Sequence, residues 1–375
     1  MKNNDLFLVI VLAIPILLQI GCNREQTAGF AKPEGIYCNW SAFDELSDTV
    51  KLDEALSMRQ LEELIRLRKL GVQVDYYIMD AFWFAKDGGY RLWREESWPY
   101  GPDSWLKRCR DNGIKPGLWF SVNNLGTWLK PIPKWESSLN NTGSRMCLFE
   151  GDYLPDLMEA MQMWVDRGIR LIKFDFANFY VATPELESTL SKEEIFQRNV
   201  GAFRNALLKF RRRNPGVKIL AYNGFGGQQN STGVPFKKDI IDLQWLNVFD
   251  ALYCGDPRLS DVPAFNFWRS MDIYSDHQVR QYEYNGVPLS RIDNMAFMIG
   301  TTGTCYGRGK NAWKGMLILF LARGGWANTF YGNLDLLTND DARWLAKSQS
   351  MFLPFQENQK ISTFGAIPGE VAPYG

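Results

Sequence analysis

Residues 154–176 read LPDLMEAMQMWVDRGIRLIKFDF, and this stretch decides the predicted fold. Residues 154–167 have apolar side chains at helical spacing, and Gly168 ends that helix. The apolar run 169–176 that follows is typical of a buried strand. A helix, a glycine stop and a buried strand in succession form one unit of a parallel sheet. Lys173 and Asp175 lie at the end of this strand, where such folds carry their chemistry.

The same unit recurs along the chain. We expect helices over 54–70, 104–112, 154–167 and 192–213, and strands over 35–40, 72–84, 114–122, 169–176, 217–223, 249–254, near 294–300 and over 328–332. About eight units in roughly 300 residues predict an α/β fold of the (β/α)8 TIM-barrel type. A doubly wound open sheet is the alternative. No glycine-rich phosphate loop follows the first strand, which argues against that alternative.

Composition excludes several classes of function. The 375 residues contain 42 basic and 42 acidic side chains and no basic tract, so nucleic acid is not an expected partner. The single histidine, His277, rules out a zinc site made of several histidines, and we expect no metal or other cofactor. The chain has 14 tryptophans, whose faces suit sugar rings as well as core packing.

The first 22 residues are typical of an export signal. Lys2 lies in a short polar start, and the apolar run 6–20 is interrupted by Pro15 and Gln19. This run is too short for a comfortable membrane span, so we expect a secretory signal. Gly21-Cys22 resembles the cleavage site of a bacterial lipoprotein, in which Cys22 is lipidated.

We therefore predict a signal peptide over 1–22 and a tether over 23–34. The protein is expected to be exported to the cell envelope and held by its lipid at the outer membrane or in the periplasm. Plain secretion and an uncleaved anchor are the alternatives. Beyond Cys22, five cysteines lack CxxC spacing, so no disulfide framework is indicated, and a single bridge stays open.

Polar and aromatic side chains cluster where the predicted strands end. They include Trp40, Asp80, Trp83, Trp119, Lys173, Asp175 and Asn223. The set offers carboxylates, an amide and aromatic rings, but no Ser–His pair. Two carboxylates with stacking aromatics are what hydrolysis of a glycosidic bond requires.

Several motifs resemble the α-galactosidase clan, glycoside hydrolase families 27 and 36. IKFDF at 172–176 resembles the nucleophile motif of the clan, and IMDAFW at 78–83 resembles its I-D-D-G-W segment. WPYG at 98–101 and GIKPGLW at 113–119 resemble W-P-x-G and G-x-K-x-G-L-W. WRSMDI at 268–273 resembles the stretch that carries the acid/base. The motifs occur in the family's order, and the resemblance spans about 35–346.

The resemblance implies roles for individual residues. Asp175 matches the nucleophile, and Asp272 matches the acid/base with one residue fewer after Arg269 than usual. Asp276 competes with Asp272 for that role, and the alternative that neither acts stays open. A cation at Lys173 keeps Asp175 ionised and can bind a sugar hydroxyl, and Arg269 is expected to bind substrate or orient the acid.

The sugar itself is less defined by the motifs. Asp80 matches the first aspartate of a pair that holds sugar hydroxyls, whereas the second is Ala81, which casts doubt on galactose. Trp40, Trp83 and Trp119 are candidates for stacking on the sugar, with core packing as the alternative for each. Asn223 is expected to line the site.

Together these features predict a retaining, exo-acting α-glycosidase, α-galactosidase-like, that hydrolyses terminal sugars of an α-linked oligo- or polysaccharide. The alternatives are a non-catalytic sugar-binding surface lipoprotein and a barrel α-glycosidase of other specificity, α-glucosidase-like. We predict a catalytic barrel over 35–350 and, over 351–375, the start of a truncated C-terminal β-sandwich.

Overall fold

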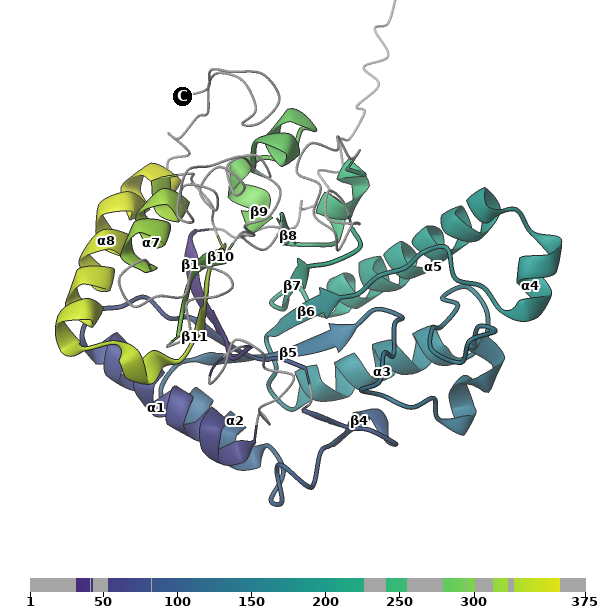
Figure 1. Cartoon of the computed structure of the whole chain (residues 1–375), viewed down its shortest axis with the longest axis horizontal. Helices are drawn as coiled ribbons and strands as arrows, with labels where there is room; N and C mark the ends of the chain where they lie inside the picture. The colour runs from purple at the N-terminus through teal and green to yellow at the C-terminus, as the bar shows by residue number, and fades with distance from the viewer. Residues whose placement is uncertain are drawn as a thin grey trace, which may run out of the picture.

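The computed structural model describes residues 32–40, 42, 53–81, 83–225, 241–254, 279–293, 295–300, 313–322 and 327–357. In these ranges nine strands pair in parallel in the order β10-β11-β1-β2-β5-β6-β7-β8-β9. The strands are β1 (Glu34–Cys38), β2 (Tyr76–Met79), β5 (Lys115–Ser121), β6 (Leu171–Asp175), β7 (Lys218–Ala221), β8 (Ala251–Tyr253), β9 (Ile292–Asp293), β10 (Met295–Ile299) and β11 (Ala327–Gly332). The sheet is curled, with helices outside it (Figure 1).

The two ends of the strand order lie next to each other in the chain. β9 pairs with β8 and β10 pairs with β11, yet only residue 294 separates β9 from β10. Consecutive Cα atoms are ~3.8 Å apart, so the two ends of the order are close in space. The parallel, curled sheet is consistent with the predicted α/β barrel.

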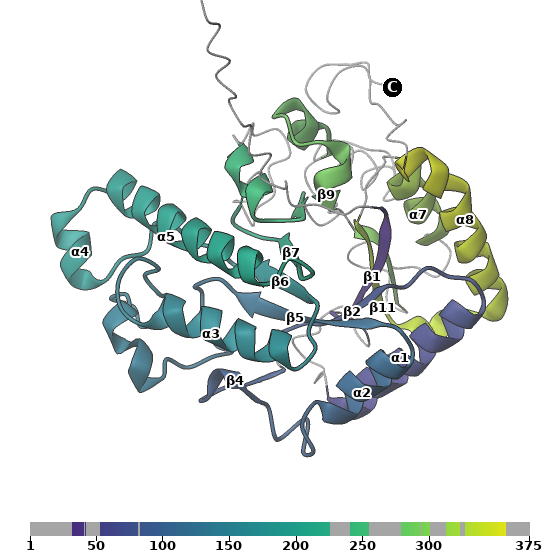
Figure 2. The same cartoon turned by 180° about the vertical axis from the view of Figure 1, so that it is seen from behind.

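Helices cover the outside of the sheet. They are α1 (Glu54–Lys69), α2 (Asp103–Asp111), α3 (Tyr153–Asp166), α5 (Lys192–Arg213), α7 (Trp313–Ala322) and α8 (Asn339–Glu357). The short α4 (Pro184–Thr189) lies beyond the end of α5 and buries none of its residues (Figure 1). α1 and α2 lie under one part of the sheet, α7 and α8 beside another, and α3 and α5 beside a third, as both views show (Figures 1 and 2).

Local sequence explains where the main helices begin. The Asp53 side chain accepts a hydrogen bond from the Leu56 backbone N–H at the start of α1. Ser191 and Glu194 form a reciprocal capping box at the start of α5. The four helices predicted from periodicity are present, with ends within one residue of the expected ones.

Alternation along the strands divides the core into two clusters. Tyr37 of β1 and Phe174 of β6 point to a large cluster shared with the helices, whereas Ile36, Cys38 and Leu171 point to a separate cluster inside the curl. Lys173 and Asp175 follow Leu171 at every second position, so they face the inside as well. The interior of the sheet therefore carries charged groups at its C-terminal end.

Two sequence predictions need correction. The strand expected over 72–84 is shorter: β2 ends at Met79, and a separate hairpin of β3 (Phe84–Ala85) and β4 (Gly89–Trp93) follows. The β-sandwich does not begin at 351, because Met351 to Glu357 belong to α8. Residues 358–375 lie outside the described residues. Within the described ranges, no helix has both the length and the apolar character to cross a bilayer.

Candidate active site

Asp175 ends β6 and is held by hydrogen bonds on both carboxylate oxygens. Its Oδ1 accepts the backbone N–H of Phe176 at 2.9 Å, and the backbone N–H and side-chain Nδ2 of Asn223 at 3.2 and 2.7 Å. Its Oδ2 accepts the indole N–H of Trp119 at 3.1 Å. The side chain is 6% exposed. The carboxylate is thus fixed by donors from three neighbouring strand ends.

The loops after β6 and β7 are shaped to hold this carboxylate. Phe176 has φ 53°, an uncommon left-handed conformation for a non-glycine residue, and its N–H turns back to Asp175. Gly224 has φ +103°, and a Cβ there would lie 2.2 Å from the Ala177 carbonyl oxygen. Only glycine lets the two loops approach so closely, and this approach brings Asn223 to Asp175.

Lys173 forms a buried ion pair beside Asp175. Its Nζ lies 2.7 Å from Oδ2 of Asp80, which follows β2, and both residues are 4% exposed. The Cys38 thiol on β1 donates to the same oxygen at 3.0 Å. The Asn39 side chain accepts the backbone N–H of Asp80 at 2.8 Å. Three strands therefore converge on one polar cluster inside the sheet.

Burial and charge act in opposite directions on these groups. Burial alone would lower the pKa of Lys173, but Asp80, Cys38 and Asp175 outweigh it and raise the pKa, so the ammonium is retained. Burial raises the pKa of Asp175 above its ordinary value. Lys173 and the hydrogen bonds from Asn223 and Trp119 oppose this rise but do not cancel it. Burial also raises the pKa of the Cys38 thiol, so Cys38 remains a donor to Asp80.

The three predicted tryptophans occupy different places. Trp119 is 1% exposed and meets Asp175 with its N–H rather than its face. Trp83 is fully buried in the outer cluster, where its N–H bonds the Trp119 carbonyl and its ring packs on Trp93, so the predicted stacking on a sugar is wrong for Trp83. Trp40 is half-buried and meets Tyr331 edge-on at 5.8 Å, against the inner cluster.

Sequence reasoning missed another buried carboxylate. Asp293 ends β9, is 1% exposed, and accepts hydrogen bonds from the Tyr222 hydroxyl at 2.9 Å and from Thr329 at 3.2 Å. Burial raises its pKa to about 7. A lone acidic residue inside an apolar stretch, Ile292 to Ile299, was the only available signal.

The structure brings together Asp175, Lys173, Asp80, Trp119 and Asn223, but several predicted residues lie outside the described ranges. These are Cys22, Arg269, Asp272 and Asp276. In the described part of the chain, no group of three or more His, Cys, Asp or Glu side chains could hold a metal ion. Cys38, Cys109 and Cys147 are buried and form no disulfide among the described residues, and Cys254 is buried as well.

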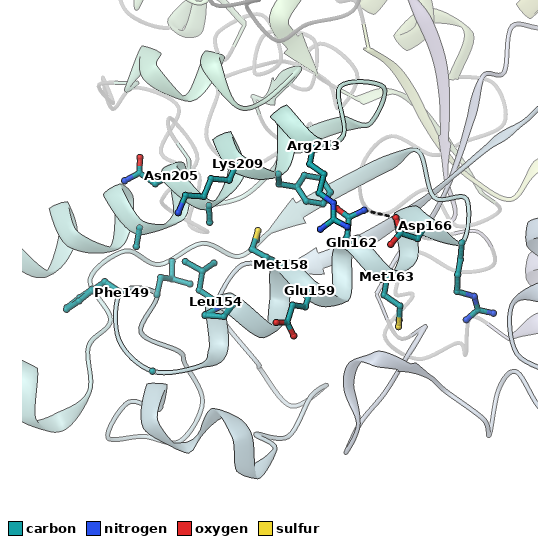
Figure 3. A pocket seen from close by; sticks show the side chains of 17 residues that line it. Phe149, Leu154, Met158, Glu159, Gln162, Met163, Asp166, Asn205, Lys209 and Arg213 are labelled. Carbon is teal, nitrogen blue, oxygen red and sulfur yellow. Dashed lines mark hydrogen bonds between the residues drawn. The ribbon is translucent and has the colours of Figure 1, made fainter.

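A separate hollow lies between α3 and α5. It has a volume of about 980 Å³ and is lined by Leu154, Met158 and Met163, with Lys209 and Arg213 among its charged residues (Figure 3). Its residues come from these two helices, the segment before α3 and Arg167, which directly follows α3, and none comes from the strand ends. The hollow is therefore distinct from the cluster around Asp175.

No family model matches the sequence, and no curated protein matches it. Solved structures of α-galactosidases do match its fold. The galactosidase domain of an α-galactosidase–sucrose kinase aligns with TM-score 0.60 at 13% identity, over 88% of this chain and 41% of that one. The family 36 α-galactosidase of Geobacillus stearothermophilus, in complex with raffinose, gives 0.58 at 15% identity over 90% and 43%.

An α-galactosidase of Saccharomyces cerevisiae gives TM-score 0.53 at 13% identity, over 87% of this chain and 64% of that one. The structural neighbours are thus the enzymes that the sequence resemblance named. At these identities the likeness shows the fold, which is that of an α-galactosidase barrel domain. The chain spans less than half the length of the first two structures, so activity and substrate are matters for proposal.

Proposed function

We propose that the chain is a retaining, exo-acting α-glycosidase of α-galactosidase type, acting on terminal sugars of an α-linked oligo- or polysaccharide. One observation carries the proposal: a buried carboxylate, Asp175, is fixed at the C-terminal end of a parallel strand beside the Lys173–Asp80 pair. The likeness of fold to α-galactosidases supports it. We further infer that β9 and β10 are one interrupted strand that closes an eight-stranded barrel.

Asp175 is the proposed nucleophile. From the described residues, Oδ1 accepts three hydrogen bonds and Oδ2 accepts one, so Oδ2 is the oxygen freer to attack. Attack on the anomeric carbon breaks the glycosidic bond and forms a glycosyl-enzyme ester. Water then attacks the same carbon, and the ester bond breaks to release the sugar and restore the Asp175 carboxylate.

The proton for the departing oxygen is assigned to Asp272, with Asp276 as its competitor. In the second step the same residue, as a carboxylate, takes the proton from water. Retention requires the two carboxyl groups to lie about 5–5.5 Å apart. Single Asp→Asn variants at both positions distinguish them, because an activated aryl glycoside needs less help from the acid than a sugar leaving group does.

The Lys173–Asp80 pair is the proposed sugar-binding element. An ammonium has three donor protons. Among the described residues, Oδ2 of Asp80 accepts one at 2.7 Å and Cys38 Sγ accepts another at 3.8 Å, so a sugar hydroxyl can accept the third. Ala81 removes the second carboxylate that galactose-specific relatives offer. A panel of aryl α-glycosides therefore tests galactose against other sugars, including glucose.

The decisive experiment compares wild type with Asp175→Asn. Wild type is expected to hydrolyse a p-nitrophenyl α-glycoside and to be labelled at Asp175 by a cyclophellitol-type probe, whereas the variant does neither while keeping its circular dichroism spectrum. The exposed Asp340 offers a matched control, Asp340→Asn, which keeps full activity. Unchanged turnover in Asp175→Asn contradicts the proposal. Ala81 favours a second candidate, a sugar-binding lipoprotein, which binds sugar without labelling.

We also propose that the protein is exported and anchored in the cell envelope by a lipid on Cys22. The proposal rests on the polar start, apolar run and Gly21-Cys22 of the first 22 residues. Labelling of cells with an alkyne fatty acid tests it. Wild type is expected to be labelled and membrane-associated, and Cys22→Ala is expected to lose both properties.

A further inference from the structure

A chain of hydroxyl groups crosses the interior of the sheet. The Tyr222 hydroxyl lies 2.9 Å from Oδ2 of Asp293 and 2.7 Å from the Tyr331 hydroxyl. Thr329 donates to the same Asp293 oxygen at 3.2 Å. These residues come from the ends of β7 and β9 and from β11, so the chain links three strands that are far apart in sequence.

The direction of this chain depends on one proton. A phenol has a single proton to donate. When Asp293 is ionised, Tyr222 donates to it, and Tyr331 must donate to Tyr222. When Oδ2 of Asp293 carries a proton, that proton can be donated to Tyr222, which then donates to Tyr331. Burial raises the pKa of both phenols, so neither loses its proton near neutrality.

The same tyrosines contact the proposed sugar-binding cation. The Nζ of Lys173 lies 4.2 Å from the centre of the Tyr222 ring and 5.8 Å from that of Tyr331. The ring of Tyr222 also stacks on the ring of Tyr253. The two ring centroids are 4.2 Å apart and the interplanar angle is 16°. A phenol that donates to a carboxylate has a more electron-rich ring, which attracts an ammonium more strongly.

Asp293 is the group in this cluster best placed to change its charge. Among the described residues, no donor reaches its buried Oδ1. Among the described residues, the other charged or titratable groups that act on Asp293 or the two phenols are Lys173, Cys38 and Tyr253, while Asp80 and Asp175 act on Lys173. Lys173 is the cation among them, and its ammonium is already bonded to Asp80. A buried carboxylate without a cation of its own favours its neutral form.

We propose that Asp293 is a positioning residue that holds a proton, and that its protonation reverses the Tyr331–Tyr222 hydrogen-bond chain and loosens the hold of Tyr222 on Lys173. The inference rests on the proposed function for its effect on sugar binding. With Asp293 neutral, Lys173 faces Asp80 and the sugar. With Asp293 ionised, the electron-rich ring and the added negative charge draw the ammonium toward Tyr222.

Infrared difference spectroscopy tests the proton directly. Wild type is expected to show the C=O band of a buried carboxylic acid that disappears as the pH rises through neutrality. Asp293→Asn, which keeps the acceptor oxygen and mimics the neutral form, is expected to lack this band. Asp340→Asn should retain it. A spectrum without such a band in wild type, or an identical band in Asp293→Asn, overturns the proposal.

The coupling to Lys173 has its own readout, independent of activity. In protein labelled with [ζ-15N]lysine, the Lys173 signal, identified by its absence in Lys173→Arg, is expected to shift with the same midpoint as the infrared band. The shift should be lost in Asp293→Asn and reduced in Tyr222→Phe. A Lys173 signal that titrates identically in wild type and Asp293→Asn overturns the coupling.

The pH profile then connects this device with the proposed function. On p-nitrophenyl α-D-galactopyranoside, kcat/KM of wild type is expected to fall roughly two- to fivefold as Asp293 ionises, the range of a modest cation–π contact. The profile of Asp293→Asn should lack this step. No hydrolysis of any aryl α-glycoside of the panel by wild type at any pH refutes the proposed function alone, because the spectroscopic results still decide the role of Asp293.

Discussion

The Nζ of Lys173 lies 2.7 Å from Oδ2 of Asp80, and neither side chain is more than 5% exposed. Such a pair is a weak source of stability as a whole, because both ions have lost their water. Breaking it is a different matter, since the remaining ion stays buried without its partner. The pair therefore joins β2 to β6 across the inside of the sheet and makes the cluster sensitive to single substitutions.

Lys173→Met is expected to lower the free energy of unfolding by about 3–5 kcal/mol, because it leaves the Asp80 carboxylate buried beside an apolar side chain. Urea denaturation measures the loss. The matched control is Lys107→Met, which breaks the exposed pair with Asp111 and should cost at most ~1 kcal/mol. The double variant Lys173→Met/Asp80→Asn should recover part of the loss. If Lys173→Met and Lys107→Met lower the free energy of unfolding equally, the result contradicts a buried Lys173–Asp80 pair.

Trp119→Phe is expected to raise the pKa of Asp175, because the indole N–H stabilises the ionised carboxylate. The acid limb of kcat/KM should move to higher pH by roughly one to two units, the equivalent of ~1.5–3 kcal/mol for a hydrogen bond to a charged group. Activity is thus lost at a higher pH than in wild type when the solution is acidified.

The control for that experiment is Trp105→Phe. Trp105 is also fully buried, but within the described part of the chain its indole N–H has no acceptor. The Trp105→Phe substitution removes the same volume from the core as Trp119→Phe, without removing a hydrogen bond. A shift of the acid limb in both variants would attribute the effect to packing rather than to the Trp119–Asp175 contact.

The sequence predicted the parts of the site that depend on local periodicity. Period-two alternation places Lys173 and Asp175 on one face of a strand, and in the structure both point into the sheet. The order of strands and helices followed from glycine stops such as Gly113 and Gly168, both of which have positive φ. These features depend only on residues that are neighbours in the sequence, which is why the sequence predicts them.

Contacts across the sheet could not be predicted from the sequence. Cys38, Asp80 and Lys173 meet only because β1, β2 and β6 curl around a common interior. Trp83 was expected near the sugar because the apolar run 72–84 reads as one strand. The chain instead leaves the sheet after Met79, and Trp83 enters the hairpin region and the outer core. Asp293 was missed for the same reason, since its partners come from distant strands.

Gly224→Ala is expected to destabilise the protein and to impair the site. The new Cβ would lie 2.2 Å from the Ala177 carbonyl oxygen, and φ +103° is unfavourable for alanine. Because the loop must shift, Asn223 loses its hydrogen bonds to Asp175, and turnover falls. Gly216→Ala is the matched control, because a Cβ there meets nothing within 4 Å. A Gly224→Ala variant with the melting temperature and kcat of Gly216→Ala contradicts the required close approach.

Asp293 should also make stability depend on pH. Its pKa is about 7 in the folded protein, against roughly 3.9 for an unfolded aspartate. The folded state therefore binds the proton more tightly, and this contribution is complete below the unfolded pKa and lost as the pH rises to about 7. Within that window the free energy of unfolding should fall by up to ~1.4 kcal/mol per pH unit.

Asp293→Asn removes this contribution, because an amide does not titrate. The difference in unfolding free energy between wild type and variant, measured by urea denaturation at several pH values, isolates Asp293 from other carboxylates such as Asp175. Wild type should lose stability relative to the variant as the pH rises from 4 to 7. A difference that stays constant across this range would mean that Asp293 is ionised throughout, and that its burial is compensated by a partner beyond Tyr222 and Thr329.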